Sequence, residues 1–305
     1  MSIMPGREEL LAGFEEALAR YRAYRAGLPA GRLARALVKL RLGGVRYAAL
    51  SALRLLRAET MSARLFCGGK FTAGVDEYGD AMYVFGLLWY EPEIRLTRFL
   101  LGHLAPGDRF VDVGANYGYY SMLAAEASPG GGVLAFEPSP RVYPFLKANL
   151  APYPRAEALQ LAASDRAGKA EFYEGAPAYS CQSTLCAEGA AGAGPARFSK
   201  TTAEEASLDA VCAARGFRPS WLKVDAEGWE DKVLAGAADT LAACRPAVVM
   251  EVWTEPQPQH RRAWEFLAGL GYKSYRISEG GGAEPCSSPG TPAGGAGWDN
   301  YVFRV

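Results

Sequence analysis

The feature of this sequence that most constrains its fold is a glycine turn between a short apolar segment and a helical pattern. Residues 109–113 read Arg-Phe-Val-Asp-Val, which is typical of a buried strand, and Gly114-Ala115-Asn116-Tyr117-Gly118 follows directly. A helical pattern then continues to Ala127. Such a turn lets a ligand approach the backbone closely, and the helix after it offers unpaired N–H groups. The turn therefore predicts a ligand site at the carboxyl end of a strand.

The chain after this turn continues to alternate between strand and helix patterns. A helix is expected from Pro140 to Leu150. Further strands are expected over residues 133–136, 158–162, 221–224, 247–252, 273–277 and 301–304. This order predicts an α/β fold with a mostly parallel sheet and helices on both faces. Two stretches rich in Gly, Ala and Pro, residues 188–195 and 279–297, are expected to be loops.

The charge pattern divides the chain in two. Residues 1–66 hold 12 basic and 5 acidic side chains, whereas the whole chain has 33 of each, so residues 67–305 are acidic. In the first part Arg32, Arg35 and Lys39 recur on one helical face. We expect a basic helical extension over residues 1–66 and a second domain over residues 67–305, with its core motifs in 108–252. The basic face is either solvated or a surface for an anionic partner, such as a membrane, a substrate or a neighbouring subunit.

Composition excludes several other classes of protein. No apolar stretch reaches the ~20 residues needed to span a bilayer, and residues 1–10 lack a signal-peptide core, so we expect a cytoplasmic protein. A formal net charge of zero gives no global field for nucleic acid. The six cysteines are scattered, and no histidine accompanies Cys181 and Cys186, so neither a disulfide framework nor a metal site is expected.

Two acidic residues near the turn indicate the cofactor. Glu137 ends the second strand, where a carboxylate can accept both hydroxyls of a ribose. Asn116 occupies the position at which a dinucleotide fingerprint has its pyrophosphate-admitting glycine. Asp112 adds a negative charge that suits a sulfonium better than a diphosphate. The residues therefore favour S-adenosylmethionine, and an NAD-dependent oxidoreductase is the alternative.

A second set of charged residues indicates the chemistry. Lys223 and Asp225 are two apart on an expected strand, so both side chains lie on one face. A carboxylate can remove the proton of an acceptor hydroxyl. Asp225 is our first candidate for this base and Glu251, at the end of the next strand, is the second, while Glu227 is expected to orient the substrate or the helix entry. The alternative is a structural ion pair between Lys223 and Asp225. Of the two histidines, His103 precedes the turn and His260 is expected to be a solvated surface residue.

Four motifs occur in an order that resembles a known family. They are Phe110 to Tyr120, Ala135-Phe136-Glu137-Pro138-Ser139-Pro140, Ala163-Ser164-Asp165, and Leu222-Lys223-Val224-Asp225-Ala226-Glu227-Gly228. Together they resemble the FkbM family of S-adenosylmethionine-dependent methyltransferases, from about Tyr90 to Glu251. The resemblance implies a doubly wound, Rossmann-like class I methyltransferase sheet that is mostly parallel with an antiparallel last strand. It also implies methyl transfer to a hydroxyl of a sugar, glycan or natural product, with nitrogen or carboxylate acceptors as the alternative.

The resemblance also implies roles for particular residues. Asp112, Gly114, Asn116 and Gly118 would line the methionine end of the cofactor, Glu137 would bind the ribose, and Ser164 and Asp165 would meet the adenine edge. Asp165 also fits a simple turn. The sequence leaves open whether the protein is a homodimer. Further alternatives for its function are a noncatalytic binding module and a nucleic-acid methyltransferase. The last is disfavoured because the catalytic part is acidic and lacks an Asn-Pro-Pro-Tyr motif.

Overall fold

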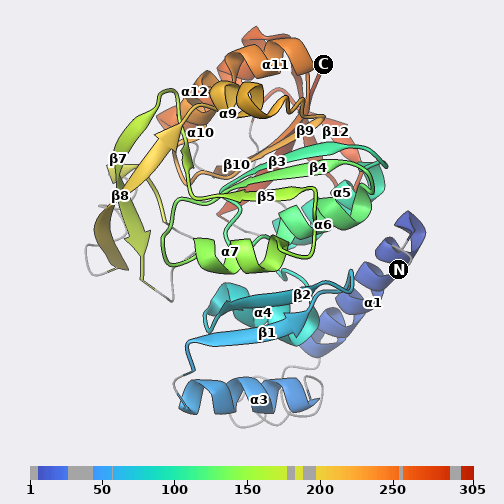
Figure 1. Ribbon diagram of the computed structural model, residues 1–305. Coiled ribbons are helices and arrows are strands. Elements are labelled where there is room, and N and C mark those ends of the chain that lie inside the picture. The colour runs from blue at the N-terminus through green and yellow to red at the C-terminus, as the bar shows by residue number, and fades with distance from the viewer. Residues whose placement is uncertain are drawn as a thin grey trace. The chain divides into compact units, whose positions relative to one another are not determined.

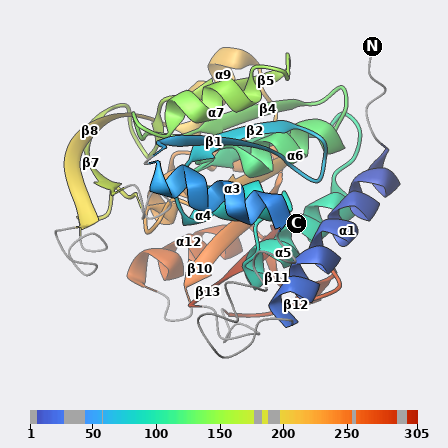
Figure 2. The ribbon, with the colours of Figure 1, turned by 90° about the horizontal axis from the view of Figure 1, so that it is seen from below.

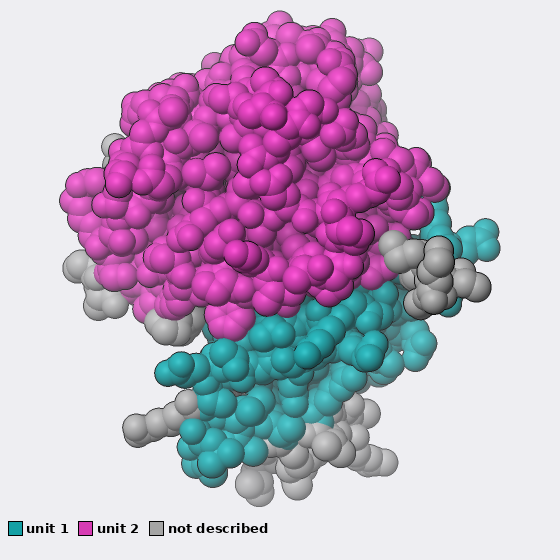
Figure 3. All heavy atoms as spheres, in the orientation of Figure 1, with its two compact units in different colours: residues 1–90 teal, residues 91–305 magenta. Residues whose placement is uncertain are grey.

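The computed structural model describes residues 6–26, 44–56, 58–176, 183–187, 197–253, 257–288 and 297–305 (Figure 1). The chain forms two compact units, residues 1–90 and residues 91–305, which are coloured separately in Figure 3. This division lies later than the boundary expected at residue 66. Arg32, Arg35 and Lys39, on which the basic face was predicted, lie outside the described residues.

Unit 1, residues 1–90, contains a hairpin as well as helices. Its helices are α1 (Arg7–Ala26), α3 (Gly44–Leu55) and α4 (Glu77–Phe85). Strands β1 (Thr60–Arg64) and β2 (Lys70–Gly74) pair antiparallel. The hairpin explains the later division, because residue 66 lies between its two strands.

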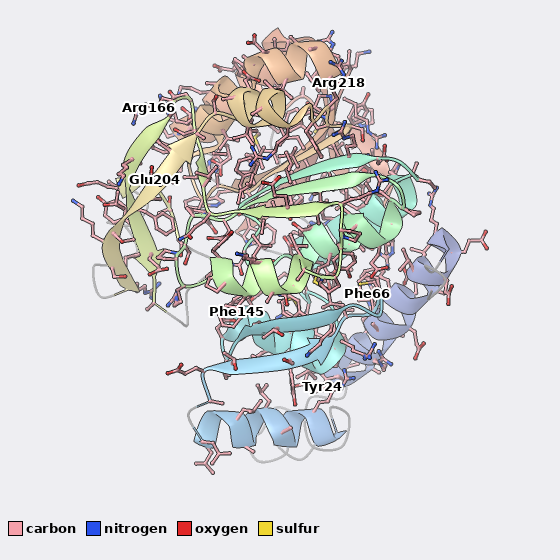
Figure 4. All side chains as sticks on the ribbon, viewed as in Figure 1. Tyr24, Phe66, Phe145, Arg166, Glu204 and Arg218 are labelled. Atoms are coloured by element: carbon pink, nitrogen blue, oxygen red, sulfur yellow. The ribbon has the colours of Figure 1, made fainter. Side chains whose placement is uncertain are left out.

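The helices of unit 1 begin and end as their local sequence dictates. The Asp76 side chain accepts the N–H of Gly79 at 2.7 Å and so caps α4, which ends at Gly86 in a left-handed conformation with φ 76°. Buried residues of α1 recur every three or four positions and include Tyr24, which is labelled in Figure 4. The ring centroids of Phe14 on α1 and Phe66 are 5.3 Å apart. No helix within the described part of the chain combines the length and hydropathy needed to cross a membrane.

Unit 2, residues 91–305, is built on an eight-stranded sheet in the order β12-β11-β13-β10-β9-β3-β4-β5. The strands are β3 (Arg109–Val113), β4 (Gly132–Phe136), β5 (Ala156–Leu159), β9 (Trp221–Val224), β10 (Ala247–Trp253), β11 (Lys273–Ile277), β12 (Ala283–Pro285) and β13 (Trp298–Arg304). Neighbours from β10 through β5 pair parallel, and β13 is antiparallel to both β10 and β11. The prediction of a mostly parallel sheet with an antiparallel last strand is confirmed.

Helices cover both faces of this sheet (Figure 1). One face carries α5 (Glu91–His103), α6 (Tyr119–Ala127) and α7 (Tyr143–Leu150). The other carries α9 (Leu208–Arg215), α10 (Glu230–Ala235), α11 (Ala238–Cys244) and α12 (Pro258–Gly269). Apolar side chains of β3, β9 and β10 pack against this second set, including Val111, Val224 and Met250. Because the core lies on both faces, the strands read as nearly continuous apolar runs.

A second, smaller sheet lies beside the central one (Figures 1 and 2). It pairs β6 (Ala162–Ala163), β8 (Phe198–Ala206) and β7 (Gly168–Gly175) in that order. The single strand expected over residues 158–162 is therefore wrong, since β5 ends at Leu159 and β6 joins the other sheet. The loop expected over residues 279–297 also contains β12, a three-residue strand that pairs with β11 at the sheet edge.

Candidate functional site

The glycine turn after β3 touches the end of β9. Gly114 has φ 73°, and a Cβ added there would lie 1.8 Å from the carbonyl oxygen of Asp225. The N–H groups of Gly114 and Ala115 donate to the carbonyl oxygen of Phe136 on β4 at 3.1 and 2.9 Å. Asn116 also has a positive φ, of 50°. Only glycine at position 114 allows the carboxyl ends of β3, β4 and β9 to meet this closely.

Glu137 binds the turn to the end of β4. Its side chain is 6% exposed, Oε2 accepts the N–H of Asn116 at 2.9 Å, and Oε1 accepts the N–H of Ser139 at 2.8 Å. Burial raises the pKa of Glu137 to about 7, although these two backbone hydrogen bonds oppose the shift. A carboxylate oxygen can accept more than one hydrogen bond, so Glu137 retains capacity for hydroxyl donors.

A buried lysine links Asp112 to Asp225. Lys223 is 3% exposed, and its Nζ lies 2.9 Å from Asp225 Oδ2 and 3.8 Å from Asp112 Oδ1. Asp112 Oδ2 accepts a hydrogen bond from Ser121 Oγ at 2.6 Å. Burial lowers the pKa of Lys223, but attraction to Asp225, Asp112 and Glu93 outweighs it and raises that pKa above its usual value. Burial likewise raises the pKa of Asp112. Lys223 and Asp225 therefore lie together as their spacing predicts, although β9 ends at Val224 and Asp225 is the first residue after the strand.

Three carboxylates cluster at the ends of β9 and β10. One oxygen each of Asp225, Glu227 and Glu251 lies within 4.8 Å of the others. Burial, followed by repulsion from Asp225, raises the pKa of both Glu227 and Glu251 well above the usual range. Oxygen ligands in this number and spacing can hold a divalent cation or face a cationic ligand. The structure thus brings the three predicted acidic residues together.

Glu93 is an acidic residue of this site that the sequence motifs did not identify as a site residue. Glu93 on α5 is 5% exposed, accepts a hydrogen bond from the Tyr120 hydroxyl, and accepts one from Asn300 Nδ2 at 3.3 Å. Burial raises the pKa of Glu93 to about 7, and attraction to Lys223 opposes that rise. The available signal was its helical spacing to Leu96, which places a charged residue on a buried face.

The side chains of Ser164 and Asp165 each contact a residue at the N-cap or in the first turn of α10. Ser164 is fully buried, and its Oγ accepts a hydrogen bond from Trp229 Nε1 at 3.4 Å. Asp165 Oδ2 lies 3.0 Å from Lys232 Nζ, and this hydrogen bond lowers the pKa of Asp165. The ion pair gives Asp165 a structural role, and the adenine contact of both residues stays a prediction.

The expectation that His260 is a solvated surface residue is wrong. His260 is 1% exposed because it lies on the same buried face of α12 as Ala263, Trp264 and Leu267. Its Nδ1 accepts the N–H of Gln257 at 3.1 Å as part of the capping box of α12. Burial lowers the pKa of His260 to about 4, so the ring is neutral near pH 7. His103 Nδ1 lies 2.7 Å from the carbonyl oxygen of Phe99, within α5.

The fold is that of an open α/β protein, and the candidate site lies at the carboxyl ends of its strands, where such proteins bind ligands. The family described as the Methyltransferase FkbM domain matches residues 112–274, which is more than half of the 305-residue chain. The chain therefore belongs to the FkbM methyltransferase domain family, as the four motifs predicted.

Comparison with individual proteins gives partial matches. The chain is 42% identical over 80 residues to the 31-O-demethyl-FK506 methyltransferase FkbM of Streptomyces tacrolimicus, a match that covers 25% of this chain and 31% of that relative. A solved methyltransferase FkbM from Methylobacillus flagellatus is 14% identical with a TM-score of 0.43, covering 86% of this chain and 60% of that one. The O-methyltransferase from Bacillus cereus, solved with SAH, is 13% identical with a TM-score of 0.37, covering 96% and 89%.

Proposed function

We propose that this chain is an S-adenosylmethionine-dependent O-methyltransferase whose acceptor is a hydroxyl of a sugar, glycan or natural product. The observation that carries the proposal is the order of functional groups at the carboxyl ends of three neighbouring strands. Glu137 follows β4, Asp112 lies on β3 with the glycine turn directly after that strand, and Asp225 follows β9. These three strands are neighbours in the order β4, β3, β9. Across these strands the site offers, in turn, a carboxylate to accept hydrogen bonds from the ribose hydroxyls, a backbone that a ligand can approach closely, and a group of carboxylates where the methyl-accepting substrate would bind.

The residues at this edge fit that cofactor. Asp112 Oδ1 is buried and lacks a hydrogen-bond partner among the described residues, so it has capacity for an ammonium donor. Glu137 offers its two oxygens to the ribose hydroxyls, and Gly114 and Asn116 give close access to the backbone. When bound, S-adenosylmethionine supplies a methyl group on a positively charged sulfur, which a negatively charged surrounding favours.

Asp225 is the proposed general base. A sugar hydroxyl is a weak nucleophile near neutral pH, and a carboxylate within hydrogen-bond reach takes its proton as the oxygen–carbon bond forms. Lys223 Nζ donates a hydrogen bond to Asp225 Oδ2 at 2.9 Å and so orients the carboxylate. Glu251 is the second candidate for the base, and Glu227 is proposed to orient the acceptor.

The first test is cofactor binding. Isothermal titration calorimetry should give a dissociation constant near the micromolar range for S-adenosylhomocysteine and no comparable binding of NAD. NAD that binds more tightly than S-adenosylhomocysteine would reverse the assignment to a methyltransferase. The second test is mass spectrometry of glycans and metabolites from cells with and without this chain, in which the product should be heavier by one CH₂ group. A methylated nitrogen or carboxylate in the product would correct the acceptor class alone.

A further inference from the structure

The turn that carries Asp225 has a backbone conformation that needs support. Glu227 has φ 49° and Gly228 has φ 94°, so two consecutive residues are left-handed. This conformation is unfavourable for a residue with a side chain, and it persists only where surrounding contacts hold it. The turn 225–228 is therefore a segment whose shape depends on its neighbours.

One buried carboxylate provides most of those contacts. Glu230 is 1% exposed, and its Oε1 accepts the N–H of Ala226 at 3.1 Å and the N–H of Gly228 at 3.0 Å. From outside the turn, Thr184 Oγ1 donates to the carbonyl oxygen of Glu227 at 2.6 Å. Glu230 thus binds the peptide groups 225–226 and 227–228, and Thr184 binds the second of these from the other side.

Glu230 is itself in contact with a buried histidine. His260 Nε2 lies 3.6 Å from Glu230 Oε2, an oxygen that has no hydrogen-bond partner among the described residues. Because His260 Nδ1 accepts the N–H of Gln257, Nε2 carries the proton of the neutral ring and points it toward Glu230. A line of contacts therefore runs from the start of α12 through His260 and Glu230 to the turn.

We propose that Glu230, with His260 behind it, is a positioning residue that fixes the turn 225–228 and thereby places the carboxylate of Asp225 for proton transfer. The inference rests on the proposed function of Asp225 and extends it to residues that do not touch the reacting atoms. Proton transfer requires the base within hydrogen-bond reach of the acceptor, and a displacement of about 1 Å can cost ~10²-fold in rate. A turn that loosens would produce such a displacement without changing the base itself.

The deciding experiment measures the turn directly. In the full chain bound to S-adenosylhomocysteine, Glu230→Ala should raise hydrogen–deuterium exchange at the amides of Ala226 and Gly228 by at least about tenfold. The amide of Asp225, which donates to Val113 at 3.2 Å within the sheet, should keep its protection. Unchanged protection of Ala226 and Gly228 would overturn the proposal.

A matched variant separates positioning from general stability. Glu205 on β8 is also buried, at 4% exposure, with one oxygen paired to Arg166 at 2.8 Å and the other without a hydrogen-bond partner among the described residues. Glu205→Ala should therefore leave exchange in the turn unchanged even where it lowers the melting temperature. If Glu230→Ala accelerates exchange across all of unit 2, as global destabilisation would, Glu230 only stabilises the fold and the proposal fails.

A conservative variant covers the case in which Glu230→Ala does not fold. Glu230→Gln retains a carbonyl oxygen for the two N–H groups, but its amide group would face the Nε2 proton of His260. Exchange at Ala226 and Gly228 should then be intermediate between wild type and Glu230→Ala, and His260→Gln should shift it in the same direction. If Glu230→Gln and His260→Gln both leave these amides as slow as in wild type, the proposal is overturned.

Turnover gives a second readout. With the acceptor found by mass spectrometry, Glu230→Gln should lower kcat by about tenfold or more while the KM for S-adenosylmethionine stays within about threefold. A normal kcat would show that the turn does not place the base. Wild-type chain that binds no S-adenosylhomocysteine would instead contradict the proposed function, and the exchange pattern would still report on the turn.

Discussion

At the scale of single residues, the site is governed by acidic groups whose pKa values are raised by burial. Among them, Glu137 is the residue proposed to bind the ribose of the cofactor. Its pKa is raised to about 7 by burial and also by repulsion from Glu174 and Asp112. Its ionised form accepts hydrogen bonds from hydroxyls better than the neutral acid does. Protonation of Glu137 should therefore compete with cofactor binding near neutral pH.

The first prediction is a pH dependence of cofactor affinity. Affinity for S-adenosylhomocysteine should rise roughly tenfold from about pH 5.5 to pH 7.5 as Glu137 loses its proton, and should level off above its folded pKa. Calorimetry across this range measures it. Glu137→Gln should remove the pH dependence, and Glu137→Ala should weaken binding by about 1.5–3 kcal/mol. Equal affinity of Glu137→Ala and wild type would place the ribose elsewhere.

The second prediction concerns the general base. Asp225→Asn keeps the size of the side chain but cannot take the proton, so turnover should fall roughly 10²–10⁴-fold while S-adenosylhomocysteine affinity changes by less than about tenfold. Initial rates and calorimetry measure the two effects. Asp239→Asn, an exposed substitution of the same kind on α11, should change neither. Near-normal turnover with a lower melting temperature would make the Lys223–Asp225 pair purely structural, and Glu251→Gln would be tested next.

The third prediction concerns the glycine turn. Gly114→Ala places a Cβ 1.8 Å from the Asp225 carbonyl oxygen at φ 73°, so the ends of β3 and β9 must move apart. Gly216→Ala is the matched control, because Gly216 also has a positive φ, of 56°, yet a Cβ there meets nothing within 4 Å. Strain at φ alone costs about 1–3 kcal/mol. Gly114→Ala should lower the melting temperature more than Gly216→Ala does, and it alone should abolish S-adenosylhomocysteine binding. Equal effects of the two variants would mean that the close approach is dispensable.

At the scale of elements, the sequence predicted best where a buried apolar run is bounded by turn residues. Strand β9 was expected over residues 221–224 and is found at Trp221–Val224, and β11 likewise agrees at Lys273–Ile277. The helix α6 begins directly after Gly118 and ends at Ala127, as its pattern indicated. In these segments local sequence and tertiary burial favour the same structure.

Elements whose structure depends on a distant partner were not predictable in this way. Strand β12 has three residues and forms by pairing with β11, and β6 has two residues that pair with β8. A period cannot be read from so few positions. The burial of His260 and of Glu93 was missed for a related reason. A polar side chain on a buried helix face is identified only when its hydrogen-bond partner is known. The partner is Gln257 for His260 and Tyr120 for Glu93.

The fourth prediction belongs to the basic segment of the chain. Arg32, Arg35 and Lys39 lie outside the described residues, and residues 20–64 contain 11 basic side chains and a single acidic one. We propose that this segment engages an anionic partner. Changing the three residues together to Gln should leave S-adenosylhomocysteine affinity intact and should raise the acceptor KM or abolish attachment to vesicles of anionic lipid. Sedimentation with such vesicles and acceptor kinetics measure these effects, and no change in either would identify a solvated face.

Across the molecule as a whole, an excess of negative charge surrounds Lys223, near the carboxyl ends of β3, β9 and β10. Five carboxylates, those of Glu93, Asp112, Asp225, Glu227 and Glu251, interact with Lys223. A single ammonium cannot neutralise five carboxylates, so the excess charge is relieved by protonation, by a cationic ligand or by a metal ion. The raised pKa values of Glu93, Glu227 and Glu251 indicate that protonation relieves part of this charge.

The last prediction distinguishes a cationic cofactor from a bound metal at this cluster. Methyl transfer to oxygen needs no Lewis acid when a carboxylate removes the proton, and the positive sulfonium itself supplies a counter-charge to Asp225, Glu227 and Glu251. Turnover after dialysis against a chelator should therefore match that of the untreated chain, and added Mg²⁺ or Ca²⁺ should not raise it. If chelation abolishes turnover and either ion restores it, the three carboxylates hold a cation. In that case Glu251→Gln should weaken the ion's binding in calorimetry, and Asp225 would act as a ligand instead of as the base.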